Sequence, residues 1–132
     1  MTYTITKDFA FSASHVLLGL VEGHQCGRLH GHNYLLRVAL SSTELDSTGF
    51  VLDFGELGPF KRWVDDHLDH RHLNDVLPPL GLEGNPSAER MARWLAEDVL
   101  PSLMPLPAGV SVAVGVRETD KCWAWWGGST HD

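Results

Sequence analysis

The sequence predicts an α+β fold, on three observations taken in chain order. Two segments of alternating polarity come first, two segments with apolar residues at helical spacing follow, and two more strand-like segments end the chain. Two strands, two helices and two strands are typical of an antiparallel sheet with helices on one face. A chain of 132 residues suffices for one hydrophobic core, so we expect a single domain over 1–132.

The composition argues against several classes of function. The formal net charge is −7, so we expect no surface for nucleic acid or an anionic membrane. An anionic ligand would have to be bound by local groups. The first residues alternate in polarity and no stretch is apolar enough to span a bilayer, so we expect no secretory signal and no membrane anchor. Cys26 and Cys122 are too few for a disulfide framework and indicate reduced thiols in the cytoplasm.

The first strand is expected over 3–15 and the second begins at His30. In each segment apolar residues alternate with polar ones, which gives the strand one apolar face that only Lys7 interrupts in the first strand. The residues of these faces are Tyr3, Ile5, Phe9, Phe11 and Ala13, and then Tyr34, Leu36, Val38 and Leu40. His15 ends the first strand with the apolar parity, and His30 and His32 begin the second with the same parity. Antiparallel pairing would bring the three imidazoles together on one face.

Two helices are expected next. The first follows "VLDFGELGPFKRWVDDHLDH", in which apolar residues recur at helical spacing and Asp53 is a candidate N-cap. Pro59 requires that this helix kinks or begins there. The second helix opens at "NPSAERMARW", with Asn85 as the expected cap and Pro86 at the first helical position. Its buried stripe is expected to be Met91, Trp94, Leu95 and Val99.

The last two strands are expected in "VSVAVGVRE" and "KCWAWWGG". Alternate residues from Val110 to Val116 point inward, and Glu118 continues this inward parity. A buried carboxylate must be paired or must bind something. Glu118 could accept two hydrogen bonds from an amidine-like edge of a heterocycle, or it could lie at an exposed strand end.

The shared parity of His15, His30 and His32 favours a zinc site. Three neutral imidazoles suit zinc and leave its fourth position open, whereas structural sites have four protein ligands. An open position is typical of Lewis-acid chemistry on an oxygen of a substrate or water. Any one of these histidines alone would be interpreted as an ordinary polar residue.

The remaining histidines give weaker signals. His67 and His70 are three residues apart and could form a second metal pair on a helix. No further ligand accompanies them in the sequence, so a solvated helix face is the better account of His67 and His72. His24 and His131 have no stronger case.

Cys26 lies in the loop before His30, and two roles stay open for it. As a fourth ligand it would close a structural site, and as a thiolate near a cation it could act as base or nucleophile. Further along, "LDHRHLND" places Asp69 beside His70, and an Asp can orient an imidazole for acid–base chemistry. Adjacent residues on a helix do not face each other, so this pair must form beyond the helix end.

Together these motifs resemble the 6-pyruvoyltetrahydropterin synthase / 6-carboxytetrahydropterin synthase family. The resemblance covers nearly the whole chain, in "FSASH", "GHQCGRLHGHNY", "TGFVLDFGEL", "LDHRHLN", "NPSAE" and "VRET". It implies the tunnelling fold (T-fold), in which ββααββ subunits form a trimeric barrel, often stacked into hexamers. Each subunit then has a four-stranded antiparallel sheet with two helices on one face.

The resemblance also implies a role for each candidate residue. By position, the family's zinc ligands match His15, His30 and His32, and its catalytic thiol matches Cys26. The catalytic dyad matches Asp69 and His70, and the pterin anchor matches Glu118. In this family the dyad comes from a neighbouring subunit. A homo-oligomer with bound Zn²⁺ and a small pterin triphosphate substrate is therefore expected.

The spacing in "CGRLHGH" resembles the bacterial 6-carboxytetrahydropterin synthases of the queuosine pathway. That branch converts 7,8-dihydroneopterin triphosphate and releases acetaldehyde and triphosphate. The alternatives are a pyruvoyl synthase, which keeps the three-carbon chain, and a non-catalytic zinc-stabilised binding protein. Ser87 and Ala88 stand where the branch often has Thr and Ser, and the tryptophan-rich end is unusual. Arg28, Arg71 and Lys121 are candidate triphosphate ligands by position.

Overall fold

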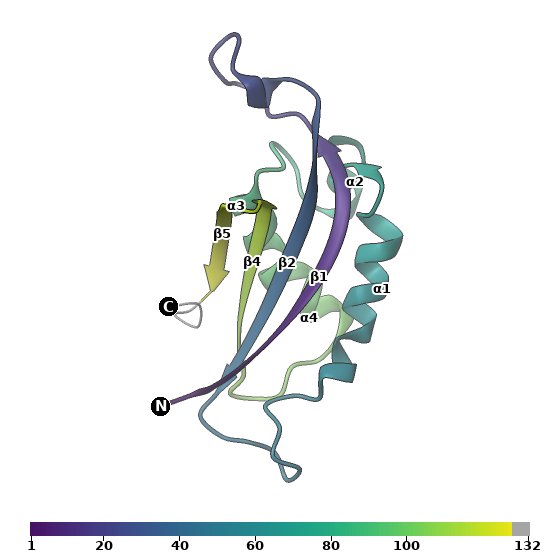
Figure 1. The fold of residues 1–132 in the computed structure, drawn as a ribbon. Coiled ribbons are helices and arrows are strands. Elements are labelled where there is room, and N and C mark those ends of the chain that lie inside the picture. Colours follow the sequence, from purple (N-terminus) through teal and green to yellow (C-terminus); the bar gives the residue numbers. More distant parts are fainter. Residues whose placement is uncertain (128–132) are drawn as a thin grey trace.

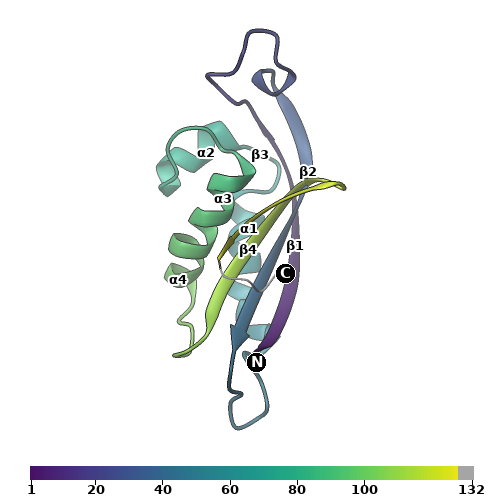
Figure 2. The same ribbon diagram turned by 90° about the vertical axis from the view of Figure 1, so that its left-hand side faces the viewer.

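The computed structural model describes residues 1–127, so His131 and the last residues of the expected domain lie outside the described part. One sheet carries a layer of helices on one face (Figures 1 and 2). The elements are β1 (Tyr3–His15), η1 (Gln25–Gly27), β2 (His30–Ser42), η2 (Phe54–Leu57), α1 (Gly58–His67), β3 (Arg71–His72), α2 (Leu73–Leu80), α3 (Ala88–Trp94), η3 (Leu95–Val99), α4 (Leu100–Leu103), β4 (Ser111–Thr119) and β5 (Cys122–Gly127). The predicted α+β class is confirmed. Within the described chain no helix is long and apolar enough to cross a bilayer.

β1 and β2 form the central ladder of the sheet. They pair antiparallel from Tyr3 opposite Ser42 to His15 opposite His30. The predicted apolar parity is confirmed from Phe9 onward, because these residues of the face are buried under the helices: Phe9, Phe11, Ala13, Tyr34, Leu36, Val38 and Leu40. At the start of β1, Tyr3 is exposed and Ile5 is half-buried. A shift of one residue would turn each of these side chains to the other face. The burial pattern therefore excludes such a shift, and in the observed register His15 lies opposite His30.

The sheet has five strands in the order β3-β1-β2-β4-β5, so the expected count of four was wrong. The additional strand, β3, pairs parallel with β1, with Ala13 opposite Arg71 and Ser14 opposite His72. Just before it, the His70 N–H donates to the Ser12 carbonyl oxygen at 2.6 Å. A strand of two residues has no alternation pattern, which is why the sequence did not reveal it.

The first predicted helix is divided into two elements. Asp53 caps the short 3-10 helix η2, where its side chain accepts from the Gly55 N–H, and so it does not cap α1. α1 begins at Gly58, with Pro59 in its first turn. Proline fits there because the first N–H groups of a helix have no partner within the helix. Of the two outcomes expected at Pro59, the helix start is the one observed.

Helix α2 was not expected, because "LNDVLPPL" contains Pro78 and Pro79, which remove two helical N–H donors. Its apolar side chains outweigh this loss, since Leu73 and Leu77 lie one turn apart and are both buried. The helix ends at Gly81, whose φ of 114° is in the region that favours glycine.

The second predicted helix is the continuous run α3, η3 and α4, with η3 a π-helical turn. Its N-cap is Ser87, whose hydroxyl accepts from the Arg90 N–H at 3.2 Å. The expected Asn85 cap was therefore wrong, and so was the expected first helical position of Pro86, which precedes the cap. Asn85 bonds instead to the distant backbone of Leu18. The predicted stripe is confirmed as buried: Met91, Trp94, Leu95 and Val99.

β4 and β5 complete the sheet, and Trp123 and Trp125 of β5 cover part of its outer face, whereas Trp126 faces the helices and donates to Glu97 at 3.0 Å. The Trp125 ring lies over Gly115, where a Cβ would come within 2.7 Å of the indole. Trp123 stacks with Trp125 at 5.7 Å, and the Arg37 guanidinium lies 4.9 Å from the Trp123 ring. The tryptophan-rich end is thus packed against the sheet.

Candidate zinc site and its surroundings

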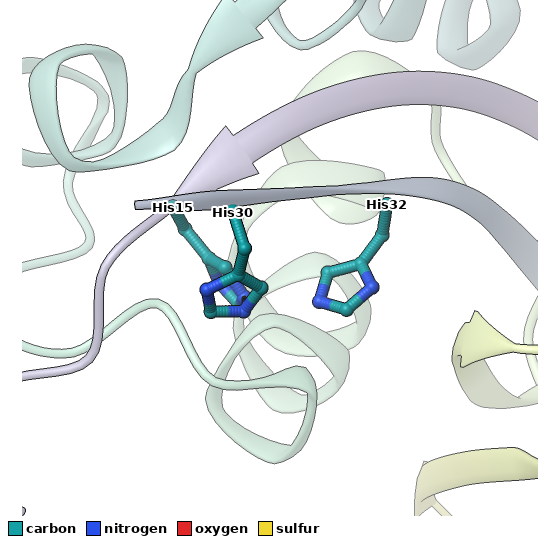
Figure 3. Close-up of side chains that lie close together, drawn as sticks. All are labelled: His15, His30 and His32. Carbon is teal, nitrogen blue, oxygen red and sulfur yellow. Dashed lines mark hydrogen bonds between the residues drawn. The ribbon is translucent and has the colours of Figure 1, made fainter. Parts of the chain in front are cut away.

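Three histidines converge where the β1–β2 ladder ends, on the helix-covered face (Figure 3). The ring centroids of His15, His30 and His32 are 4.5 to 5.1 Å apart. One nitrogen of each ring lies within 4.8 Å of the others, and over residues 1–127 no other group of three or more potential ligands is found. His15 is fully buried and the other two rings are half-buried. We call these three side chains the histidine group.

Two backbone carbonyl groups determine which ring nitrogens face the centre of the group. His15 Nδ1 lies 2.9 Å from the Pro86 carbonyl oxygen, and His30 Nδ1 lies 2.7 Å from that of Arg28. A carbonyl oxygen only accepts, so each Nδ1 carries a proton and each neutral ring has its lone pair on Nε2. These two Nε2 atoms are 2.9 Å apart. Two lone pairs that face each other can share a bound cation, and imidazoles oriented by backbone carbonyl groups are typical of zinc ligands.

Burial supports the same assignment for His15. Removal from water lowers the pKa of His15 below its ordinary value of 6.5, and the charges of His30 and His32 lower it further. The Pro86 carbonyl acts in the opposite direction, with a smaller effect than burial. Neutral imidazole is the form that ligates a metal, so burial keeps His15 ready for binding at neutral pH.

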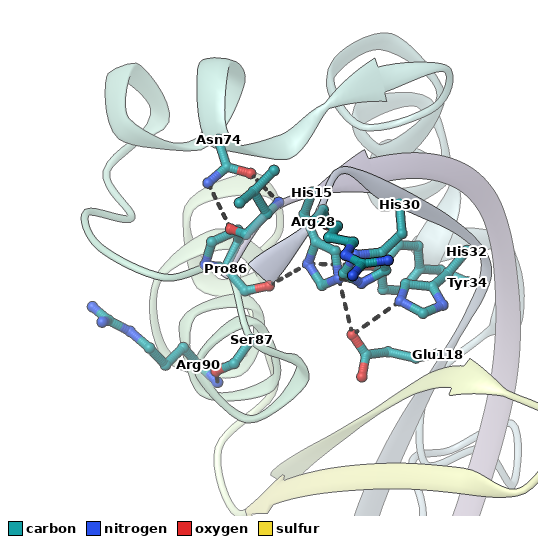
Figure 4. Close-up of polar contacts among 11 residues, drawn as sticks. His15, Arg28, His30, His32, Tyr34, Asn74, Pro86, Ser87, Arg90 and Glu118 are labelled. Carbon is teal, nitrogen blue, oxygen red and sulfur yellow. Dashed lines mark hydrogen bonds and ion pairs between the residues drawn. The ribbon is translucent and has the colours of Figure 1, made fainter. Parts of the chain in front are cut away.

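Glu118 points from β4 toward the histidine group, in line with its predicted inward parity (Figure 4). Its Oε2 lies 3.5 Å from His15 Nε2 and 3.7 Å from His32 Nε2. The Glu118 side chain is 27% exposed, so solvent reaches only part of it. A carboxylate this close would offset the charge of a bound cation and can accept hydrogen bonds from a ligand beside it.

Cys26 lies in η1, within the loop 16–29 that extends beyond the end of the sheet (Figure 1). Its thiol is free and half-buried, and it is not a member of the histidine group. The Cys26 N–H donates to His24 Nδ1 at 3.0 Å, and its carbonyl oxygen accepts from the Leu17 N–H at 3.1 Å. This placement favours an open three-histidine site with a separate thiol over a closed four-ligand site.

Asp69 and His70 pair beyond the end of α1, where adjacent residues can meet. His70 Nδ1 lies 2.9 Å from Asp69 Oδ2, and Asp69 Oδ1 accepts from the Ser12 N–H at 2.9 Å. The Ser12 N–H, and after it His70, lower the pKa of the Asp69 carboxyl below its ordinary value of 3.8. His70 has a φ of 58°, the only positive φ of a non-glycine residue in the described chain, and its side chain is 83% exposed. The backbone there is strained, and such strain is common at functional positions.

His70 of this pair borders a cleft on the sheet of its own chain. The cleft has a volume of about 480 Å³ and is lined largely by residues of outward parity in β1 and β2 together with β3: Ser12, Ser14, Gly31, Asn33, Arg71 and His72. Ala13 and His32, which have inward parity, border it as well. The histidine group has the inward parity of the same two strands. His32 is thus the member of the histidine group that borders the same cleft as His70, whereas His15 and His30 are not among its lining residues.

The remaining histidines differ from expectation in one respect. His72 is on β3, not on a solvated helix face, and its Nδ1 lies 2.9 Å from the Ser14 hydroxyl. His67 is exposed at the end of α1, and its ring centroid lies 5.4 Å from that of Trp63. α1 ends at His67, so His70 is not on the same helix. A second metal pair on one helix is thereby ruled out for these residues.

Three basic residues were singled out for a triphosphate, and they lie on different elements. Arg28 is exposed in the loop 16–29, and Lys121 is exposed in the turn between β4 and β5. Arg71 borders the cleft beside His70, and its guanidinium donates to the Asp66 carbonyl oxygen at 3.2 Å. Of the three, Arg71 is thus the one that lies with the acid–base pair.

The chain matches the sequence profile of the 6-pyruvoyl tetrahydropterin synthase family over residues 4–129. It belongs to this family. It is 42% identical over 98 residues to the 6-carboxy-5,6,7,8-tetrahydropterin synthase of Synechocystis sp., with 70% of this chain and 71% of the relative covered. To the Bacillus subtilis protein of the same name it is 35% identical over 126 residues, with 92% and 84% covered.

Solved structures of the family have the same fold. The Caenorhabditis elegans 6-pyruvoyl tetrahydropterin synthase superposes with a TM-score of 0.79 at 29% identity, covering 98% of this chain and 97% of that one. The chain is therefore an enzyme of the tetrahydropterin synthase type with the T-fold. A non-catalytic binding protein, one of the alternatives from the sequence, is not supported.

Proposed function

We propose that this enzyme is a zinc-dependent 6-carboxy-5,6,7,8-tetrahydropterin synthase. It would convert 7,8-dihydroneopterin triphosphate and water to 6-carboxytetrahydropterin, acetaldehyde and triphosphate, in cytoplasmic 7-deazapurine (queuosine) biosynthesis. The observation that carries the proposal is the open histidine group with Glu118 at its side and Cys26 free of it. The "CGRLHGH" spacing and the two named bacterial relatives support the carboxy branch.

The histidine group would hold the zinc ion. His15 and His30 offer their Nε2 lone pairs, because their Nδ1 atoms are already bonded to backbone carbonyl groups. His32 supplies the third imidazole from the same face of β2. Zinc bound there would act as a Lewis acid on the hydroxyl oxygens of the substrate side chain and acidify the neighbouring carbon-bound proton.

The other residues position the substrate and move protons. Glu118 would accept hydrogen bonds from the amino and N–H edge of the pterin ring and so hold the side chain at the histidine group. Cys26, as thiolate, would take the carbon-bound proton. His70, oriented by Asp69, would exchange the proton of the second step, in which the carbon–carbon bond breaks. Oxidation and reduction are internal to the substrate, so no redox cofactor is required.

The acid–base pair would be supplied by a neighbouring copy of the chain. His70 is 83% exposed and borders a cleft lined mainly by outward-facing residues of its own sheet, which supports this assignment. A homo-oligomer based on a trimer would bring the cleft of one subunit to the histidine group of the next. Each complete site would then contain groups from two chains.

Product analysis tests this function. Zinc-loaded protein is incubated with 7,8-dihydroneopterin triphosphate, and the pterin product, acetaldehyde and triphosphate are quantified. We expect acetaldehyde in equal amount to 6-carboxytetrahydropterin. Release of triphosphate without acetaldehyde would instead identify a pyruvoyl synthase, and no conversion at all would refute both.

A further inference from the structure

Two asparagine side chains hold the start of the loop that carries Cys26. Asn74, in the first turn of α2, accepts from the Val16 N–H at 2.8 Å and donates to the Val16 carbonyl oxygen at 2.9 Å (Figure 4). Asn85, just before α3, makes the same two bonds with Leu18, both at 2.8 Å. Each side-chain amide therefore takes the place of a neighbouring strand, and the β1 ladder continues beyond its last residue.

The residue between the two held positions contacts Cys26 directly. In an extended segment the N–H and C=O groups of successive residues point to opposite sides. The polar groups of Val16 and Leu18 face the asparagines, so those of Leu17 face the other way. There the Leu17 N–H donates to the Cys26 carbonyl oxygen at 3.1 Å. The position of the Cys26 backbone thus depends on how the segment 16–18 is held.

The loop has little else to keep it in place. None of the residues 16–29 is buried, and several apolar side chains project into solvent: Leu18, Leu20, Val21 and Leu29. A segment without buried contacts opens at low free-energy cost unless hydrogen bonds hold it. The two asparagines supply four such bonds from outside the loop.

The same contacts join the loop to the metal ligands. Asn85 is followed by Pro86, whose carbonyl oxygen accepts from His15 Nδ1 at 2.9 Å. The Pro86 carbonyl thus bonds to His15, and the neighbouring Asn85 side chain bonds to the backbone of Leu18, three residues after His15. Residues 85 and 86 are therefore bonded both to the loop that carries the thiol and to His15 of the histidine group.

We propose that Asn74 and Asn85 are positioning residues for the Cys26 thiol. They fix the backbone of 16–18 so that Cys26 is presented at a constant distance to a substrate held at the histidine group. This inference rests on the proposed function for its catalytic consequence, whereas its structural part stands on the contacts alone.

Thiol alkylation tests the structural part. Asn74→Asp and Asn85→Asp keep the shape and the acceptor of the side chain but remove the donor and place negative charge beside a carbonyl oxygen. In zinc-loaded protein, alkylation of Cys26 by iodoacetamide is compared with that of Cys122, which is exposed on β5 and serves as internal reference. We expect the Cys26 to Cys122 rate ratio to rise about tenfold, the effect of losing one to two hydrogen bonds. Zinc content and melting temperature should stay near those of the wild type.

Turnover tests the catalytic part. We expect kcat to fall roughly ten- to a hundredfold in either variant, because a misplaced reacting group costs about that much, with KM within about threefold. Glu22→Gln, an exposed charge change in the same loop, is the matched control and should keep both the ratio and kcat. Asn74→Ala and Asn85→Ala, which lack both bonds without added charge, should repeat the aspartate results.

Each outcome decides the inference. An unchanged alkylation ratio, a raised ratio with unchanged kcat, or loss of zinc from either aspartate variant would overturn it. If wild-type protein does not convert the pterin triphosphate, the proposed function fails by itself. The alkylation ratio would then still show whether the asparagines hold the thiol.

Discussion

The histidine group and the Asp69–His70 pair differ in how much of their surroundings one chain supplies. His15 is fully buried, and both its ring and that of His30 are oriented by backbone carbonyl groups. The His70 side chain, by contrast, is 83% exposed and borders a cleft lined mainly by outward-facing residues. Folding of one chain thus surrounds the histidine group with protein, whereas it leaves most of the His70 side chain exposed.

Removal of one metal ligand should have the largest effect. His32→Ala leaves two imidazoles, which hold zinc poorly, so both metal and activity should be lost. Zinc content after dialysis and turnover of the pterin triphosphate measure the two losses. His67→Ala, a histidine exposed on α1, is the control and should keep its zinc. Full zinc occupancy in His32→Ala would argue against the histidine group as the metal site.

Mixing two inactive variants tests directly whether Cys26 and His70 of one site come from different chains. Cys26→Ala and His70→Ala proteins should each lose turnover by about 10²- to 10⁴-fold, since each lacks a proton-transfer group. Co-expressed chains should regain activity in about a quarter of the sites if every site takes one group from each of two neighbouring subunits in a closed ring. If each chain used its own pair, every site would lack a group. Verified mixed oligomers without recovered turnover would therefore exclude the intersubunit site.

The Asp69 carboxylate gives a smaller, pH-dependent effect on stability. Its pKa is lowered in the folded chain by the Ser12 N–H and then by His70. Its stabilising contribution is therefore present above the pKa of the unfolded chain and is lost as the pH falls through the lower folded value. The urea midpoints of wild type and Asp69→Asn should differ near neutral pH and converge as the pH falls below about 3.8. Asp65→Asn, in an exposed ion pair on α1, controls for the change of charge. A difference that persists undiminished into acid would contradict this linkage.

The smallest effect is expected at the cap of α3. Ser87→Ala removes the acceptor for the Arg90 N–H and should cost about 1 kcal/mol of the free energy of unfolding. Zinc content and turnover should not change, because His15 is bonded to the carbonyl oxygen of Pro86 and not to the side chain of Ser87. Urea denaturation measures the first quantity and metal analysis the second. Zinc loss in Ser87→Ala would show that the metal ligands depend on the start of this helix.

The inward side of the site could be predicted from the sequence because strands have a period of two. That period places His15, His30, His32 and Glu118 on the face of the buried aliphatic residues, and the structure brings all four together there. The same pattern excludes a shift of one residue between β1 and β2, and the structure gives the alignment that places His15 opposite His30.

The rest depends on backbone atoms and on distant partners, which a side-chain pattern does not contain. Asp69 is held by the Ser12 N–H, and His15 by the Pro86 carbonyl. Asn85 has the chemistry of a helix cap, and the sequence could not show that its bonds go to Leu18, 67 positions away. The only local signal for this role was the cluster of asparagine and proline before a helix.

The left-handed backbone at His70 affects which residues are favoured at position 70. Glycine and asparagine adopt a φ near 58° at lower free-energy cost than histidine, by about 1 kcal/mol for glycine. Selection for folding alone would therefore move position 70 away from histidine over many generations. A lineage that keeps the imidazole does so against this difference in stability, and engineering for thermal stability would be expected to remove this histidine early, together with the proton transfer proposed for it.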